Sequence, residues 1–143
     1  MRSRGERTER GASALELSLV APFFLALIFL VIQSALYFYA SNVAVSAARE
    51  GVADVRLLNR EEYERVGGEA RIRAYVEEYV SAVGQTTFSL KGGSEGVAVD
   101  YRPQRVTVTV SGDALSLLGP LYDLSVTREA SGEVERFEPD LGQ

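Results

Sequence analysis

The feature that most constrains this chain is a long segment without charge. Residues 17–48 contain no charged side chain, although 24% of the whole chain is Asp, Glu, Lys or Arg. An apolar run of 18 or more uncharged residues is typical of a transmembrane helix. Residues 17–40 would form a helix about 36 Å long, enough to cross about 30 Å of hydrocarbon with some tilt. A buried core helix is the alternative, but a chain of 143 residues leaves too little sequence to enclose one.

The flank before this segment is basic and sets the orientation. An excess of Lys and Arg marks the cytoplasmic side of a membrane span. Four arginines precede the span here: Arg2, Arg4, Arg7 and Arg10. We therefore expect a cytoplasmic N-terminus and an exported C-terminal part. A removed secretory signal fits less well, because its apolar core spans only about 7–15 residues, although Val45-Ser46-Ala47 resembles a weak cleavage site.

The exported part is acidic and lacks cysteine. Residues 49–143 carry 11 of the 15 basic and 17 of the 20 acidic side chains. This balance favours neither nucleic acid nor anionic lipid as a partner. Because the chain has no cysteine, disulfides are excluded and the exported domain must be stabilised by packing.

The composition also argues against an enzyme. Histidine and cysteine are absent, which removes the commonest bases, thiol nucleophiles and soft metal ligands. The one lysine, Lys91, stands in a glycine-rich stretch, and Phe88 occupies the serine position of a Ser-x-x-Lys motif. The glycine clusters match no phosphate or dinucleotide fingerprint. We predict no catalytic residue, no metal site and no cofactor.

One acid, Glu16, stands at the start of the apolar run. A carboxylate at the bilayer centre costs about 2.5–3.5 kcal/mol on insertion scales, and less near the interface. Glu16 either reaches water at the cytoplasmic boundary, beside Arg10, or pairs with a positive group made nearby. Cleavage after Gly11, whose backbone is open to a protease, would give Ala12 a free ammonium. Ala12 and Glu16 are four residues apart and so share one side of a helix, and the acid could equally meet the amine of a neighbouring subunit.

These residues together resemble the prepilin signal of type IV pilin-like proteins. More specifically, RGASALELSLVAPFFLALIFLVIQSALYFYASNVAVSAAREG is similar to the N-terminal stretch of TadE-like pseudopilins of tight-adherence (Tad) pilus systems. The matching features are Arg10-Gly11, Glu16, Pro22 and the stretch Ser46–Glu50. The resemblance covers residues 10–51, and the TadE, TadF and TadG-like subtypes share much of it.

The resemblance implies a processing event and a set of partners. A membrane aspartyl prepilin peptidase would cut between Gly11 and Ala12, which places Glu16 at the fifth mature position. The implied partners are the bacterial inner membrane, other pilins and pseudopilins, the peptidase and the pilus assembly platform. Major pilins of these systems are very short and usually follow the acid with tyrosine. Leu17 and the large exported domain therefore favour a minor pseudopilin, which is incorporated in the pilus or supports its assembly. The alternative is a single-span anchored binding or sensor domain that keeps its leader.

Pro22 predicts a helix kink within the span. Proline cannot donate a hydrogen bond to the carbonyl of Ser18, four residues earlier, and bends a helix there. Deeper in the span, Gln33 and Ser34 either hydrogen-bond across helices or are simply tolerated.

The remaining sequence predicts a small α+β domain. The first helix should end near Leu58, and its small residues, Ala40, Ala44 and Ala48, pack either on neighbouring subunits or on the protein's own sheet, which we favour. Asn59 and Glu62 indicate a capping box, Gly67-Gly68 an interruption, and residues 69–83 an amphipathic helix that packs on a sheet rather than on a membrane. Gly84 closes this helix.

After Gly84 the apolar period changes to two, which indicates strands. We expect strands at residues 86–90, 97–101 and 105–111, with a hairpin loop at 91–96, and a last hairpin of LSVTRE and VERF across Ser131-Gly132. The apolar segment 113–123 is expected to fold back as a lid on the core, or else to form a subunit contact. The predicted organisation is a leader at 1–11, a long helix at 12–58 that spans the membrane at about 17–40, and an extracytoplasmic domain at 59–143, with a helix packed on an antiparallel sheet.

Overall fold

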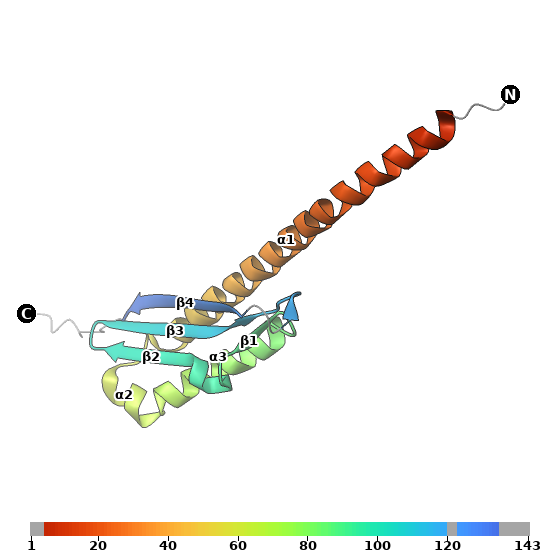
Figure 1. Ribbon diagram of the computed structural model, residues 1–143. Coiled ribbons are helices and arrows are strands. Elements are labelled where there is room, and N and C mark those ends of the chain that lie inside the picture. Colours follow the sequence, from red (N-terminus) through yellow and green to blue (C-terminus); the bar gives the residue numbers. More distant parts are fainter. Residues whose placement is uncertain (1–4, 120–122, 135–143) are drawn as a thin grey trace, which may run out of the picture. The chain divides into compact units, whose positions relative to one another are not determined.

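The computed structural model describes residues 5–119 and 123–134, with side chains from residue 15 onward. The chain divides into two compact units, Met1–Ala35 and Leu36–Gln143. The elements, labelled in Figure 1, are α1 (Gly5–Val55), α2 (Arg60–Arg65), α3 (Gly68–Val83), β1 (Phe88–Leu90), the 3-10 helix η1 (Gly93–Gly96), β2 (Val97–Arg102), β3 (Arg105–Ala114) and β4 (Leu124–Glu133). The α+β fold, with a long apolar N-terminal helix before a helix packed on an antiparallel sheet, is confirmed.

Strand β3 organises the sheet, because the other three strands all pair with it antiparallel. β4 pairs along its whole length, from Arg105↔Glu133 to Ala114↔Leu124. β2 pairs with residues 105–110 and β1 with residues 112–114. Since β4 occupies one edge of β3, β1 and β2 must lie end to end along the other edge.

The predicted hairpin between residues 86–90 and 97–101 is therefore wrong. The connecting residues 91–96 include η1 and keep the chain on the same edge of β3 instead of reversing it. Gly92 and Gly93 take positive φ angles of 68° and 66°, which glycine adopts without steric cost. Gly96 is buried so closely on β3 that a Cβ atom there would lie 2.5 Å from the carbonyl oxygen of Ser111.

The predicted hairpin across Ser131-Gly132 is also wrong, because both residues lie inside the continuous strand β4. They pair with Thr107 and Val106 of β3. A Cβ atom at Gly132 would lie 2.6 Å from Cγ1 of Val52, so this glycine allows α1 to approach the sheet rather than forming a turn. Of the second predicted hairpin strand, only Val134 lies within the described residues.

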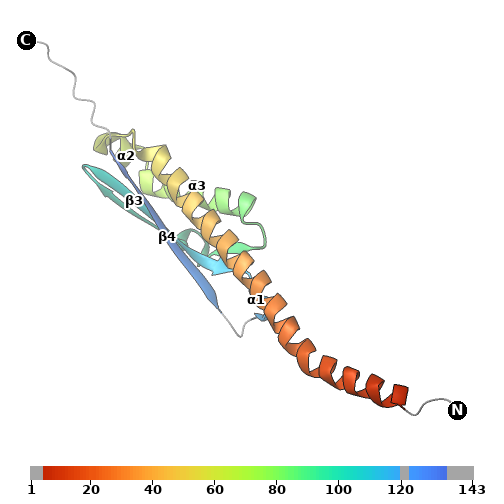
Figure 2. The same cartoon turned by 90° about the horizontal axis from the view of Figure 1, so that it is seen from above.

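The core forms between one face of the sheet and two helices. The alternation predicted for β3 is confirmed, since Val106, Val108 and Val110 are fully buried while the intervening threonines are partly exposed. The apolar stripe of α3 contributes three buried residues, Ile72, Val76 and Val80. Figure 2 shows the C-terminal part of α1 beside α3.

The C-terminal part of α1 packs on the protein's own domain. Ala40, Ala44 and Ala48 are each 0% exposed. A Cβ atom at Gly51 would lie 3.2 Å from side-chain carbons of α3 and 3.4 Å from Val108 of β3. Of the two predicted roles for the small-residue stripe, packing on the own sheet is the one observed.

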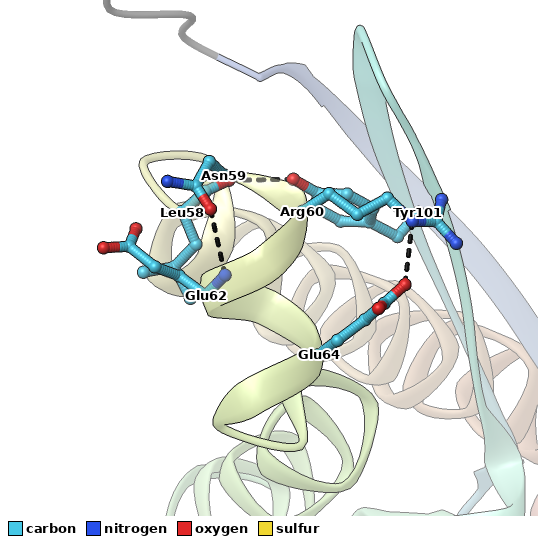
Figure 3. Close-up of polar contacts among 6 residues, drawn as sticks. All are labelled: Leu58, Asn59, Arg60, Glu62, Glu64 and Tyr101. Atoms are coloured by element: carbon cyan, nitrogen blue, oxygen red, sulfur yellow. Dashed lines mark hydrogen bonds and ion pairs between the residues drawn. The ribbon is translucent and has the colours of Figure 1, made fainter.

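The helix ends largely follow the predicted caps. α1 ends at Val55, three residues before the expected Leu58, and Leu58 N–H then bonds to the carbonyl of Val55 in a tighter turn. Asn59 caps α2 by accepting a hydrogen bond from the backbone N–H of Glu62 (2.9 Å), as drawn in Figure 3. Residues 66–67 separate α2 from α3, and Gly84 caps the end of α3.

Two tyrosines fasten the turn between α1 and α2 to the sheet. The hydroxyl of Tyr101 on β2 donates to the carbonyl of Leu58 (2.8 Å; Figure 3). Its ring stacks on Tyr63 with centroids 4.1 Å apart and planes inclined by 16°. Burial raises the pKa of both Tyr63 and Tyr101. The nearby ion pair between Arg60 and Glu64 is exposed, and such pairs contribute little to stability.

Tyr101→Phe is expected to lower the free energy of unfolding by about 0.5–1.5 kcal/mol, because it removes one hydrogen bond but keeps the stacked ring. The raised pKa means that the folded state favours the neutral phenol. The stabilisation of the folded state by the neutral Tyr101 hydroxyl is therefore fully present below the ordinary tyrosine pKa of about 10. It is lost as the pH rises through the folded-state pKa. Denaturant titration of the wild type and of Tyr101→Phe at pH 8 and at pH 11 gives the difference between their free energies of unfolding. We expect this difference to be smaller at pH 11. An equal difference at both pH values would contradict this.

The predicted lid over the core is not observed. Leu115, Leu117 and Leu118 are 41%, 43% and 54% exposed. Leu121 and Tyr122, which belong to the same prediction, lie outside the described residues. The core is formed by other residues, mainly the valines of β3 and residues of the two helices, and the described leucines of this segment are not among them.

Candidate functional site

The candidate site is the exposed apolar part of α1. From Leu15 to Ile32, every Leu, Ile, Val and Phe side chain is at least 39% exposed. Among the described residues, one helix is long and apolar enough to cross a membrane, within Leu15–Val55. Because one side of α1 is buried in the domain from Ala40 onward, the part with apolar side chains exposed all round ends just before Ala40. This apolar helix suggests single-pass membrane anchoring.

Aromatic side chains mark the point where α1 passes into the domain. Tyr37, Phe38 and Tyr39 follow one another there, and Phe38 is 66% exposed. Aromatic residues are enriched at the boundary between lipid and water. The hydroxyl of Tyr39 donates to the carbonyl of Val83, the last residue of α3 (3.0 Å). This bond joins α1 to the C-terminal end of α3 at the expected membrane boundary.

Glu16 lies on this apolar surface. Its side chain is exposed, as are those of Leu15 and Leu17 on either side. The ion pairs of the described side chains all lie within Leu36–Val134, so Glu16 has no described counter-charge. The next charged residue along the chain is Arg49, beyond the apolar segment. A positive group for Glu16 must therefore come from the N-terminal side or from another molecule.

The predicted cleavage site lies within the same helix. Gly11 and Ala12 both fall inside α1, which begins at Gly5. The backbone is helical from Ala12 to Glu16, so the two residues lie one turn apart, as assumed for their pairing. The helix also includes part of the segment predicted as a separate leader, since it begins at Gly5.

Two serine hydroxyls of the apolar helix, those of Ser18 and Ser34, make local contacts. α1 continues through Pro22, and the kink predicted there stays a prediction. The hydroxyl of Ser18 donates to the carbonyl of Leu15 (2.9 Å), and the hydroxyl of Ser34 donates to the carbonyl of Leu30 (2.8 Å). Both hydroxyls are satisfied within their own helix. Neither depends on a neighbouring helix for a partner.

Comparison with known proteins identifies this region. Residues 11–53 match the family model described as TadE-like protein. This segment is TadE-like. No curated protein and no solved structure matches the chain. The resemblance predicted for residues 10–51 is confirmed over this segment by the match, which begins at Gly11, the residue before the predicted cut.

The TadE-like segment covers two different surfaces of α1. Its first part, up to Tyr39, is the exposed apolar surface with Glu16 and Pro22. Its second part, from Ala40 to Ala53, contains the small residues that pack on α3 and β3. The matched segment therefore includes both the exposed apolar part of α1 and the helix side on which the domain packs. The residues from α2 onward lie outside the match.

The described acidic side chains outside the apolar helix do not gather into a metal-binding group. Among the side chains of residues 15–119 and 123–134, no group of three or more His, Cys, Asp or Glu is placed to hold a metal ion. The paired acids Glu77 and Glu78 are both exposed on α3. The features that sequence analysis missed are Tyr39 and Tyr101, whose hydroxyls hold the two ends of the domain.

Proposed function

We propose that this protein is a minor pseudopilin that takes part in the assembly of a Tad-type pilus. The TadE-like match suggests involvement in Tad pilus assembly. The observation that carries the finer proposal is Glu16, a single carboxylate at the start of an exposed apolar helix and one turn after Ala12. A domain with its own core, as large as Leu36–Val134, favours a minor component over the main subunit of the filament.

The proposed sequence of events begins in the bacterial inner membrane. The basic flank stays in the cytoplasm, α1 spans the bilayer, and the α+β domain lies outside. A prepilin peptidase cuts between Gly11 and Ala12 and thereby creates an ammonium group at Ala12. The trimmed helix then packs against the helices of other pilins at the assembly platform.

The chemistry of assembly in this proposal is electrostatic compensation in a medium of low dielectric. A lone carboxylate among lipid tails is unfavourable, and an ammonium within hydrogen-bond distance offsets that cost. The ammonium of Ala12 is supplied either by the same helix or by a neighbouring subunit. In the second case, the pairing would select helices in one axial register. The apolar side chains from Leu15 to Ile32 would supply the remaining contact area.

The experiment that tests the proposal is mass spectrometry of the intact protein extracted from the membranes of its native host. We expect a mature chain that begins at Ala12. A Gly11→Val variant is the matched control, because a β-branched residue at the cut should leave the leader in place. A wild-type chain that still carries Met1–Gly11 would overturn the proposal and favour an anchored binding or sensor domain. A chain that begins near Ala48 would instead indicate an exported protein.

A further inference from the structure

A group of exposed leucines follows strand β3. The leucine loop, defined here as Leu115, Leu117 and Leu118, is 41–54% exposed. Residues 114–119 carry no charge, and Gly119 ends this stretch with a φ angle of 62°. Three exposed leucines within four consecutive residues are many for one surface loop, and exposed apolar side chains that lie together mark contact with another molecule or with lipid.

Hydrogen bonds place this loop at the end of the domain where α1 enters. The backbone N–H of Leu115 donates to the carbonyl of Thr87 (2.8 Å), and Thr87 N–H donates to the carbonyl of Gly84 (2.9 Å). The residue before Gly84 is Val83, whose carbonyl accepts from the hydroxyl of Tyr39 (3.0 Å). All of these residues belong to the compact unit that starts at Leu36.

The opposite end of the same unit is equally well defined. There the hydroxyl of Tyr101 holds the carbonyl of Leu58, and Val134 N–H bonds to the carbonyl of Gln104 in the turn between β2 and β3. α1 runs from Tyr39 at one end to Val55 near the other, and β3 runs in the reverse direction. The leucine loop therefore lies near Tyr39, and Gln104 lies away from it.

The position of the leucine loop near Tyr39 indicates which partner, lipid or protein, the loop contacts. The surface of α1 changes at this point from exposed and apolar to buried in the domain, so the water–lipid boundary falls near Tyr37–Tyr39. The uncharged apolar loop belongs to the same end of this unit as Tyr39, so it lies at the end that would be closest to the bilayer if α1 spans it. The acids at its base, Asp113 and Asp123, give no attraction to anionic headgroups, so the contact must be apolar.

We propose that the leucine loop inserts into the extracytoplasmic leaflet beside α1 and gives the domain a second attachment to the membrane. The loop removes three leucine side chains from water, and α1 fixes the domain close enough for this to happen. The insertion requires that α1 spans the membrane but does not depend on a role in pilus assembly. It would restrict rotation of the domain about the axis of α1.

The test uses the full chain and its lack of cysteine, which makes single-cysteine labelling clean. Leu118→Cys is labelled with an environment-sensitive fluorophore and reconstituted at one copy per nanodisc, with and without lipids that carry a nitroxide on the acyl chain. Phe38→Cys at the helix boundary is the positive control, and Gln104→Cys at the opposite end is the negative control. We expect nitroxide quenching of the Leu118 label to be several-fold stronger than that of the Gln104 label and comparable with that of the Phe38 label.

A second variant shows whether the leucines cause the insertion. Leu117→Asp in the Leu118→Cys background adds a charge at an exposed position and should reduce the quenching to the Gln104 level. Equal quenching of the Leu118 and Gln104 labels in the parent would overturn the proposal. So would a fluorescence shift seen only with several copies per disc, because it would assign the loop to contact with a second copy. Neither result changes the mass of the mature chain, so the proposed function is tested separately.

Discussion

Replacing Phe88 with alanine is expected to lower the free energy of unfolding of the domain by about 3–5 kcal/mol, as for other fully buried phenylalanines. Phe88 is 1% exposed and is the largest fully buried side chain of the described core. It comes from β1, a strand of three residues that pairs with β3 only through residues 112–114. So short a strand has few backbone hydrogen bonds, so we expect the buried ring to be the main contact that holds it in place.

Denaturant unfolding of the full chain in detergent micelles, followed by the near-ultraviolet circular dichroism of its tyrosines, measures this effect. Tyr75→Ala is the matched control, because it removes an aromatic ring that is 40% exposed on α3. We expect it to shift the unfolding midpoint by well under half as much. Similar shifts for the two variants would show that the ring of Phe88 does not anchor β1.

The room for the ring is made by Gly112 on β3. A Cβ atom there would lie 2.5 Å from Cζ of Phe88 and would also press on the carbonyl oxygen of Ser89. Gly112→Ala should therefore destabilise the domain by about 1–3 kcal/mol through overpacking. In the double variant Phe88→Ala/Gly112→Ala, the added methyl group no longer meets the ring. The loss of unfolding free energy in the double variant should therefore be smaller than the sum of the losses in the two single variants. Simple additivity would contradict the proposed packing.

Local sequence patterns predicted the elements of this domain well. The buried residues of α3 and the valines of β3 lie at the spacings that define one face of a helix or strand, and the cap of α2 is formed by the side chain of Asn59 itself. These features depend on neighbours within a few residues along the chain. The uncharged span and Glu16 could also be identified from the sequence, because a single charge in an apolar run is a local feature that requires no knowledge of tertiary contacts.

The errors came from glycines whose role depends on distant contacts. Gly132 and Gly96 were interpreted as turn residues, but one lies under Val52 of α1 and the other against Ser111 of β3. A glycine in a turn and a glycine at a close approach cannot be distinguished without knowing what packs on it. The exposure of the leucine loop and its position near Tyr39 likewise depend on the antiparallel course of α1 and β3, which no local pattern specifies.

Replacing Glu16 with glutamine is expected to leave membrane insertion intact and to weaken association with partner pilins about tenfold or more, which corresponds to about 1.4 kcal/mol. Insertion is spared because the variant removes a charge that is unfavourable in lipid. Under the proposed function, association is weakened because the ammonium that cleavage gives Ala12 would lose its counter-ion, and an unpaired charge in a medium of low dielectric is strongly destabilising. The measurement is the amount of partner pilin that co-purifies with the tagged protein from host membranes.

Ser18→Ala is the control for a change at the same depth of the helix. Its hydroxyl donates to the carbonyl of Leu15 in the same helix, so its removal should leave assembly unchanged. If Glu16→Gln assembled as well as Ser18→Ala, the electrostatic pairing would be excluded, even if the protein still entered the pilus.

The leader provides a stricter test of the same pairing. In a Gly11→Val chain that is not cut, the nitrogen of Ala12 remains a neutral amide, so Glu16 has no ammonium to meet on its own helix. Glu16→Gln should then cause little further loss when every pilin in the membrane is uncut. If trimmed partner subunits are supplied, the acid regains an ammonium from a neighbour and the effect of the substitution should return.

The outcomes distinguish where the pairing occurs. A loss of association that returns with trimmed neighbours would assign the pairing to two subunits. A loss of association seen only when the chain itself is trimmed would assign it to one helix. A loss of equal size in every background would mean that Glu16 acts on something other than the new N-terminus.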